Sequence, residues 1–232
     1  MTNPLLAPWT APFGLPPFAA ARPEHFAPAF AEAMARHLAE IDAIAASAEA
    51  PSFENTIAAL DRSGRDLARI EALFYNLTSS ETSPALQEVQ RAIAPQLAAQ
   101  GHRVRTHPGL FARIDALHAQ RDTLALDDEQ RRVLERFHLD SVRAGADLAP
   151  PARARHAEIV QRLAELTTRF GQNVLADESG FQLVLRGEAD LAGLPESVRA
   201  AARQAGAERG VAAGAGIALS RSLIVPFLTF SE

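Results

Sequence analysis

The chain has 232 residues, 47% of them hydrophobic, and a formal net charge of −5, so it can build a substantial core. The negative charge and the lack of any concentrated stretch of Lys and Arg argue against a nucleic-acid binder, because phosphate contacts need a basic surface. Cysteine is absent, which excludes disulfides, thiolate nucleophiles and thiolate metal sites. No window has the roughly 18 apolar residues that a membrane span needs. We therefore expect neither nucleic acid nor membrane as a partner, and a cytoplasmic location.

Residues 1–23 form a proline-rich segment in which large apolar side chains, including Trp9, lie between the prolines. Proline blocks helix formation, yet the apolar side chains still favour burial. The pattern predicts an extended arm packed on a helical body.

Residues 24–176 carry apolar side chains at steps of three and four, which predicts one helix after another. One long helix is expected from Phe53 to Leu77, continuing across Gly64. Ser83 followed by Pro84 is a helix start signal, and Gly145 is a helix stop. Ile159, Leu163, Leu166 and Phe170 mark the last helical stripe, and such stripes are interpreted as core.

Residues 177–232 change period. Phe181, Leu183 and Leu185 fall on one side of an extended chain, and Gln182 and Arg186 fall on the other, which predicts a strand. A helix follows from about Pro195 to Arg209, and Gly216–Leu219 offers a second strand. The fold class is therefore mainly α: a multi-helix lobe with long antiparallel helices, and a small two-strand β unit near the C-terminus.

The sequence shows no self-contained active site, and we assign no catalytic, cofactor-binding or metal-binding residue. No HExxH, GxGxxG, P-loop or GxSxG motif is present. The nearest approach to a metal motif is the ExxH step Glu135–His138, which in a four-helix bundle can contribute to a di-metal centre if further carboxylates face inward. The alternative for His138 is a place at the edge of the apolar face.

Several long segments resemble a known family when taken in order. They are NPLLAPW, PFGLPPF, RPEHFAPAF, SFENTIAALDRSG, LTTRFGQNVLADES, LAGLP and PFLTFS. Together they are similar to the amino-terminal portion of the thimet oligopeptidase and oligopeptidase A family of zinc metallopeptidases, with the bacterial peptidyl-dipeptidase branch as the nearest match.

The resemblance implies a lobe of a two-lobed, largely helical enzyme with a deep channel. Zinc, the HExxH motif and the glutamate ligand are expected in a carboxy-terminal catalytic lobe that this chain lacks. Short peptides and that missing lobe are the expected partners, and residues 177–232 would lead into it.

Two functions follow as hypotheses. The first is the channel-forming lobe of a zinc-dependent peptidyl-dipeptidase that releases dipeptides from C-termini, inactive by itself and with no cofactor of its own. The second is a non-catalytic helical module that binds peptides or proteins. A di-metal bundle through Glu135 and His138 is a third, weaker interpretation.

Overall fold

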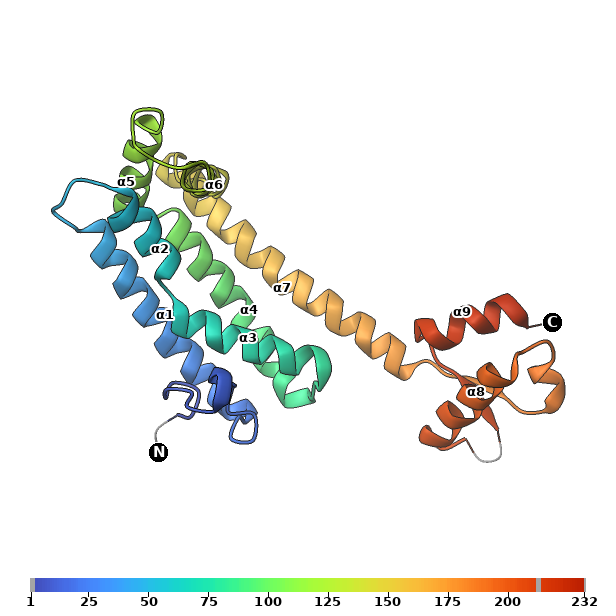
Figure 1. The fold of residues 1–232 in the computed structure, drawn as a ribbon. Helices are drawn as coiled ribbons and strands as arrows, with labels where there is room; N and C mark the ends of the chain where they lie inside the picture. The colour runs from blue at the N-terminus through green and yellow to red at the C-terminus, as the bar shows by residue number, and fades with distance from the viewer. Residues whose placement is uncertain (1–2, 212–213, 232) are drawn as a thin grey trace. The chain divides into compact units, whose positions relative to one another are not determined.

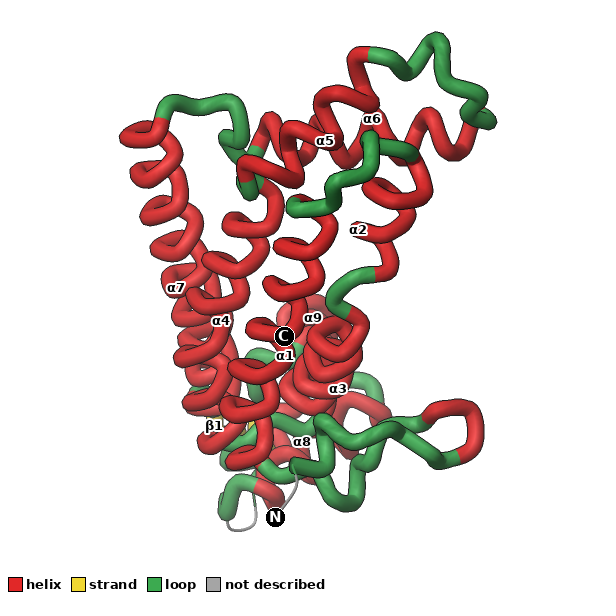
Figure 2. Tube along the Cα trace, turned by 90° about the vertical axis from the view of Figure 1, so that its left-hand side faces the viewer, coloured by secondary structure: helices red, strands yellow, loops and turns green. Residues whose placement is uncertain are grey.

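The computed structural model of this chain describes residues 3–211 and 214–231. It is mainly helical with one two-stranded antiparallel sheet, so the predicted fold class is confirmed (Figure 2). Contacts between residues divide the chain into a first unit, Met1–Thr168, and a second unit, Arg169–Glu232. No helix in the described ranges is both long enough and apolar enough to cross a membrane.

The first unit is built from helices (Figure 1). Its elements are the 3₁₀ turn η1 (Pro12–Gly14), α1 (Pro23–Ala45), the π-helical segment η2 (Phe53–Ala58), α2 (Ala59–Arg62), α3 (Arg65–Ser80), α4 (Pro84–Arg105), α5 (Pro108–Ala119), α6 (Asp128–Arg143) and the start of α7 (Pro150–Gly180). Helix starts follow the expected signals: Ser83 Oγ accepts from the backbone N–H of Leu86 at 3.3 Å. Gly145, with φ +91°, directly follows the C-cap residue of α6 and ends that helix.

One core cluster joins α1, α3 and α4. Its centre is aromatic: the Phe74 ring lies 4.9 Å from the Phe26 ring and 5.4 Å from the Phe30 ring, centroid to centroid. Leu5 of the proline-rich segment is fully buried in the same cluster, and the Arg69 guanidinium lies 4.6 Å from the centre of the Trp9 ring. Burying each large side chain contributes about 1.5–3 kcal/mol, which holds this segment against the helices.

A second core cluster lies where α5 and α6 pack beside η2 and the end of α1. Its fully or almost fully buried members are Ile41, Ile57, Leu110, Ile114, Leu117 and Leu134. Arg113 of α5 is also buried here, and its guanidinium donates to the backbone oxygens of Ser47 and Glu49 at 3.1 and 3.0 Å. The charged group therefore organises the loop between α1 and η2.

The single helix predicted from Phe53 to Leu77 is wrong. Helix α2 ends at Arg62, and α3 begins at Arg65 after Ser63 and Gly64 turn the chain. Gly64 has φ +68°, a left-handed conformation that glycine adopts at little cost. The apolar spacing continues across the break, so periodicity alone does not reveal it.

The second unit contains the end of α7, β1 (Leu183–Leu185), the 3₁₀ turn η3 (Glu188–Leu191), α8 (Glu196–Glu208), β2 (Ala215–Ile217) and α9 (Arg221–Phe230). The strands pair antiparallel, with Leu183 opposite Ile217 and Leu185 opposite Ala215. Helix α8 packs on β2 so closely that a Cβ at Gly206 would lie 2.8 Å from the backbone oxygen of Gly214. This helix cover supplies the burial that two short strands cannot supply themselves.

Candidate functional site

The metal centre suggested by Glu135 and His138 has no ligand set in the structure. His138 Nε2 lies 3.0 Å from Asp115 Oδ1, and Glu135 faces Arg132 at 3.6 Å. Across residues 3–211 and 214–231, no three or more His, Asp or Glu side chains are placed to hold a metal ion. The di-metal interpretation therefore has no support in these residues.

His138 instead takes part in a stacked pair. Its ring lies 3.8 Å from the ring of His118, centroid to centroid, with 4° between the planes. Burial, together with the neighbouring positive charges of His138 and Arg121, lowers the pKa of His118. A neutral, stacked imidazole that links α5 to α6 has a packing role.

A second group of polar side chains surrounds Gly64. His37 Nε2 lies 3.3 Å from Ser63 Oγ, and His37 Nδ1 lies 3.5 Å from the amide nitrogen of Gln100. Hollows of about 350 and 430 Å³ border His37 and Ser63. A serine beside a neutral histidine is the pairing that nucleophilic catalysis uses.

The hydrogen bonds argue against a nucleophile at Ser63. Its hydroxyl donates to the backbone oxygen of Leu60 at 2.6 Å, so its proton does not point at His37. The amide of Gln100 donates to His37 Nδ1, which leaves Nε2 as the protonated nitrogen that donates to Ser63. Each of these donors has an acceptor, and the hydrogen bonds join α1, α2 and α4. Neither ring nitrogen of His37 is available to act as a base towards Ser63.

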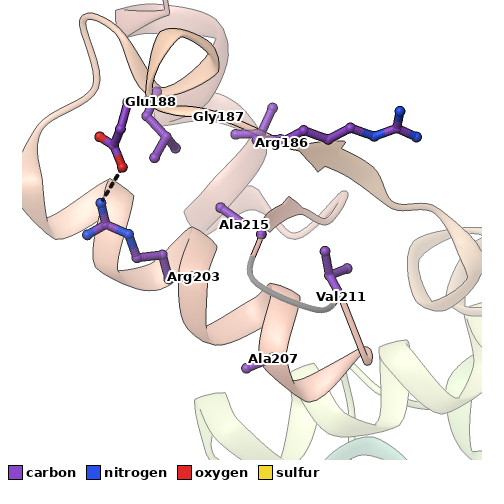
Figure 3. Close-up of a pocket in the computed structure, with 10 residues that line it drawn as sticks. Arg186, Gly187, Glu188, Arg203, Ala207, Val211 and Ala215 are labelled. Carbon is purple, nitrogen blue, oxygen red and sulfur yellow. Dashed lines mark hydrogen bonds and ion pairs between the residues drawn. The ribbon is translucent and has the colours of Figure 1, made fainter.

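The second unit has its own pocket of about 570 Å³, between η3, α8 and β2. Figure 3 shows Glu188 and Arg203 facing each other across it, while the Arg186 side chain extends away from that pair. Glu188 lies 3.3 Å from Arg203 and 3.6 Å from Arg199, and Arg203 also lies 3.5 Å from Glu196. These opposite charges neutralise one another. Glu188 and Arg203 therefore offer no unpaired charge to a ligand in the pocket.

Helix α7 carries an exposed apolar stripe. Helix α7 has 31 residues and none of them is buried. Leu163 is 57% exposed and Phe170 is 70% exposed, and Ile159 and Leu166 on the same stripe are also exposed. Steps of four, three and four place these side chains on one face of the helix. The interpretation of this stripe as core is therefore wrong for the described chain.

An exposed apolar stripe of this kind is typical of an interaction surface. Soluble proteins rarely leave a continuous row of large apolar side chains in water. Helical spacing identified the row correctly from the sequence, but it could not show what covers the row. The α7 stripe (Ile159, Leu163, Leu166 and Phe170) is the candidate functional site.

Comparison with known proteins gives the context for this surface. The chain is 37% identical to the dipeptidyl carboxypeptidase of Escherichia coli (strain K12) over 209 residues, which are 90% of this chain and 31% of that protein. It is 32% identical to the oligopeptidase A of Salmonella typhimurium over 232 residues, 100% of this chain and 33% of that protein. The chain is a homologue of these peptidases.

Both relatives are members of the thimet oligopeptidase family, so the resemblance expected from the sequence is confirmed. A more distant relative is the organellar oligopeptidase A of Arabidopsis thaliana, 24% identical over 90% of this chain. No protein-family model matches the chain. The chain spans about a third of the length of the bacterial relatives that it matches.

Proposed function

We propose that this chain is the helical, channel-forming amino-terminal lobe of a zinc-dependent peptidase that removes dipeptides from the C-termini of short peptides in the cytoplasm. The observation that carries the proposal is homology over 90–100% of the chain to about a third of the length of two kinds of peptidase. The peptide substrate and the zinc are properties proposed for the whole enzyme.

Zinc does not fit the described residues of this chain. A zinc ion in a peptidase needs three protein ligands, and the described ranges contain no suitable group of three or more His, Asp or Glu side chains. In the proposed enzyme, the metal ligands and the residues that act on the peptide bond lie outside these ranges. This chain contributes shape and packing, and by itself it does not hydrolyse peptides.

The exposed α7 stripe agrees with a chain that contributes packing while other residues carry out the hydrolysis. A helix in water gains most of its stability from tertiary packing of an apolar face. The stripe on α7 presents such a face, and in the proposed enzyme the catalytic lobe covers it.

A mixing experiment tests the proposal. The purified chain is combined with zinc and the complementary two thirds of the E. coli dipeptidyl carboxypeptidase, and release of a dipeptide from a blocked tetrapeptide is measured. The chain alone should match the blank, and the mixture should exceed the complementary part alone.

Two results would contradict the proposal. Zinc-dependent dipeptide release by the chain alone would place an active centre within it. A complementary part that folds, as judged by circular dichroism, but neither binds this chain nor gains activity from it would exclude the role of a lobe.

A further inference from the structure

A separate hollow in the first unit is lined by cationic and imidazole side chains from three helices. Helix α4 contributes His102 and Arg105, α6 contributes Arg143, and α7 contributes His156. The hollow has a volume of about 340 Å³. That is roughly ten times the ~30 Å³ share of one water molecule, enough for a small polyatomic ion and its remaining water.

The charges around this hollow are unbalanced. Arg105 and Arg143 are exposed at its edge, and neither has an ion-pair or hydrogen-bond partner in the ranges that the structure describes. The acid that lines the hollow is Asp140, and its Oδ2 accepts from Arg136 Nε at 3.0 Å. The carboxylate is therefore already matched, and the two guanidinium groups give an excess of positive charge.

The two histidines also line this hollow, and His156 Nε2 is the imidazole nitrogen that has no protein partner among the described residues, because the nitrogens of His102 face His156 and Thr106. His102 Nε2 lies 3.1 Å from His156 Nδ1, and the rings stack with centroids 5.2 Å apart. Burial and the positive charges of His156, Arg105 and Arg153 lower the pKa of His102. A bound anion would offset these charges and favour the protonated imidazole.

We propose that His102, Arg105, Arg143 and His156 form a binding site for an oxyanion, a carboxylate or phosphate group. Guanidinium groups match the planar oxygen pairs of carboxylates and phosphates, and charge-assisted hydrogen bonds are stronger than neutral ones. The ion can come from a free phosphate or from the terminal carboxylate of a peptide. The site is independent of the proposed peptidase role.

Sulfate is a suitable first probe because it keeps its charge throughout the relevant pH range. The full chain is titrated with sulfate, and the imidazole resonances of His102 and His156 are followed by NMR. Saturable shifts of both are expected. Arg105→Gln and Arg143→Gln should each weaken sulfate binding about tenfold, the loss expected for one charge-assisted hydrogen bond.

Arg132→Gln is the matched control. Arg132 lies on α6 like Arg143, its side chain is 78% exposed, and the change removes the same charge. Sulfate binding by this variant should match the original chain. Equal weakening of sulfate binding in all three variants would show that sulfate is attracted to positive charge in general, which would overturn the proposed site. The absence of saturable imidazole shifts would overturn it as well. Circular dichroism confirms that each variant is folded.

The pH dependence gives a second readout. The charged groups that face His102 are Arg105 on its own helix, Arg143 and Asp140 on α6, and His156 and Arg153 on α7. Binding at about pH 6 should be tighter than at about pH 8, because bound sulfate beside the ring favours protonation of His102. Identical sulfate affinities at both pH values would contradict the assignment of the histidines to the site.

Two further titrations identify the source of the anion. Inorganic phosphate is compared with a blocked tripeptide that has either a free or an amidated C-terminus. Displacement of sulfate by phosphate alone assigns a free phosphate, and displacement by the free peptide but not its amide assigns a peptide carboxylate. Failure of both to displace sulfate would overturn the proposal.

Discussion

Three partly or fully buried histidines, His37, His102 and His118, lead us to expect a stability that depends on pH in mild acid. Burial is the main cause that lowers the pKa of His37, His102 and His118 below the ordinary value of 6.5. As the pH falls below 6.5, the unfolded chain therefore takes up protons at these histidines at a higher pH than the folded chain does. The free energy of unfolding should therefore decrease from about pH 6.5 downwards and be level above it.

Urea unfolding at a series of pH values measures this decrease. A double variant with His37→Gln and His118→Gln should show a shallower decrease between about pH 6.5 and 5.5. Glu71 acts in the opposite direction, because burial raises its pKa above 4.5, so comparison with the original chain isolates the histidines. Stability that rises as the pH falls, equally in both proteins, would contradict the prediction.

Arg113 is the buried charge on which the α1–η2 loop depends. The residue is 7% exposed, and its guanidinium also donates to Asn55 Oδ1 at 2.9 Å and Thr56 Oγ1 at 3.3 Å. Arg113→Leu leaves these acceptors without their donor, so we expect a loss of about 3 kcal/mol in the free energy of unfolding. Arg113→Lys should recover only part, because lysine lacks the planar fork.

Chemical denaturation of the two variants checks this prediction, with Arg132→Leu as the exposed control. The control should change the stability by less than about 0.5 kcal/mol. An Arg113→Leu variant as stable as the control would show that the loop does not depend on the guanidinium.

At the scale of elements, helix α8 can pack closely on β2 only because Gly206 has no side chain. Helix propensity alone predicts that Gly→Ala in a helix stabilises by up to about 1 kcal/mol. At Gly206 a Cβ would meet backbone atoms at 2.8–3.1 Å, so the packing must shift. We expect Gly206→Ala to destabilise the second unit by about 1–3 kcal/mol.

Gly171 is the matched control, because it also lies in a helix but a Cβ there would have no neighbour within 4 Å. Gly171→Ala should be neutral or stabilising. Amide hydrogen exchange reports each unit separately, and Gly206→Ala should lower protection in β1, β2 and α8. Unchanged protection in these elements would contradict the close packing.

The α7 stripe gives a prediction for the mixing experiment. Leu163→Glu places a charge on the stripe, whereas Gln161→Glu adds the same charge two positions earlier, on the other side of the helix. Leu163→Glu should abolish most of the gain in peptidase activity, because burying an unpaired carboxylate is costly. Gln161→Glu should leave the gain unchanged, and equal effects of the two variants would exclude the stripe as the docking surface.

At the scale of the whole molecule, zinc should not stabilise this chain. A ligand that binds the folded state raises the unfolding temperature, and no group of metal-binding side chains was found in the described residues. The midpoint of thermal unfolding should be the same with zinc and with a chelator. A rise of several degrees on adding zinc would reveal a metal site.

The sequence alone determined the mainly helical fold and the relationship to peptidases, because periodicity and long matching segments are local properties of the chain. It also located most helix starts, such as the Ser83–Pro84 signal. It could not place the break at Gly64, because the apolar spacing continues through a left-handed glycine. It also missed Arg113 and the cationic hollow, whose members come from helices far apart in sequence. Burial is decided only when helices pack, and so the tertiary structure alone showed that the α7 stripe is exposed.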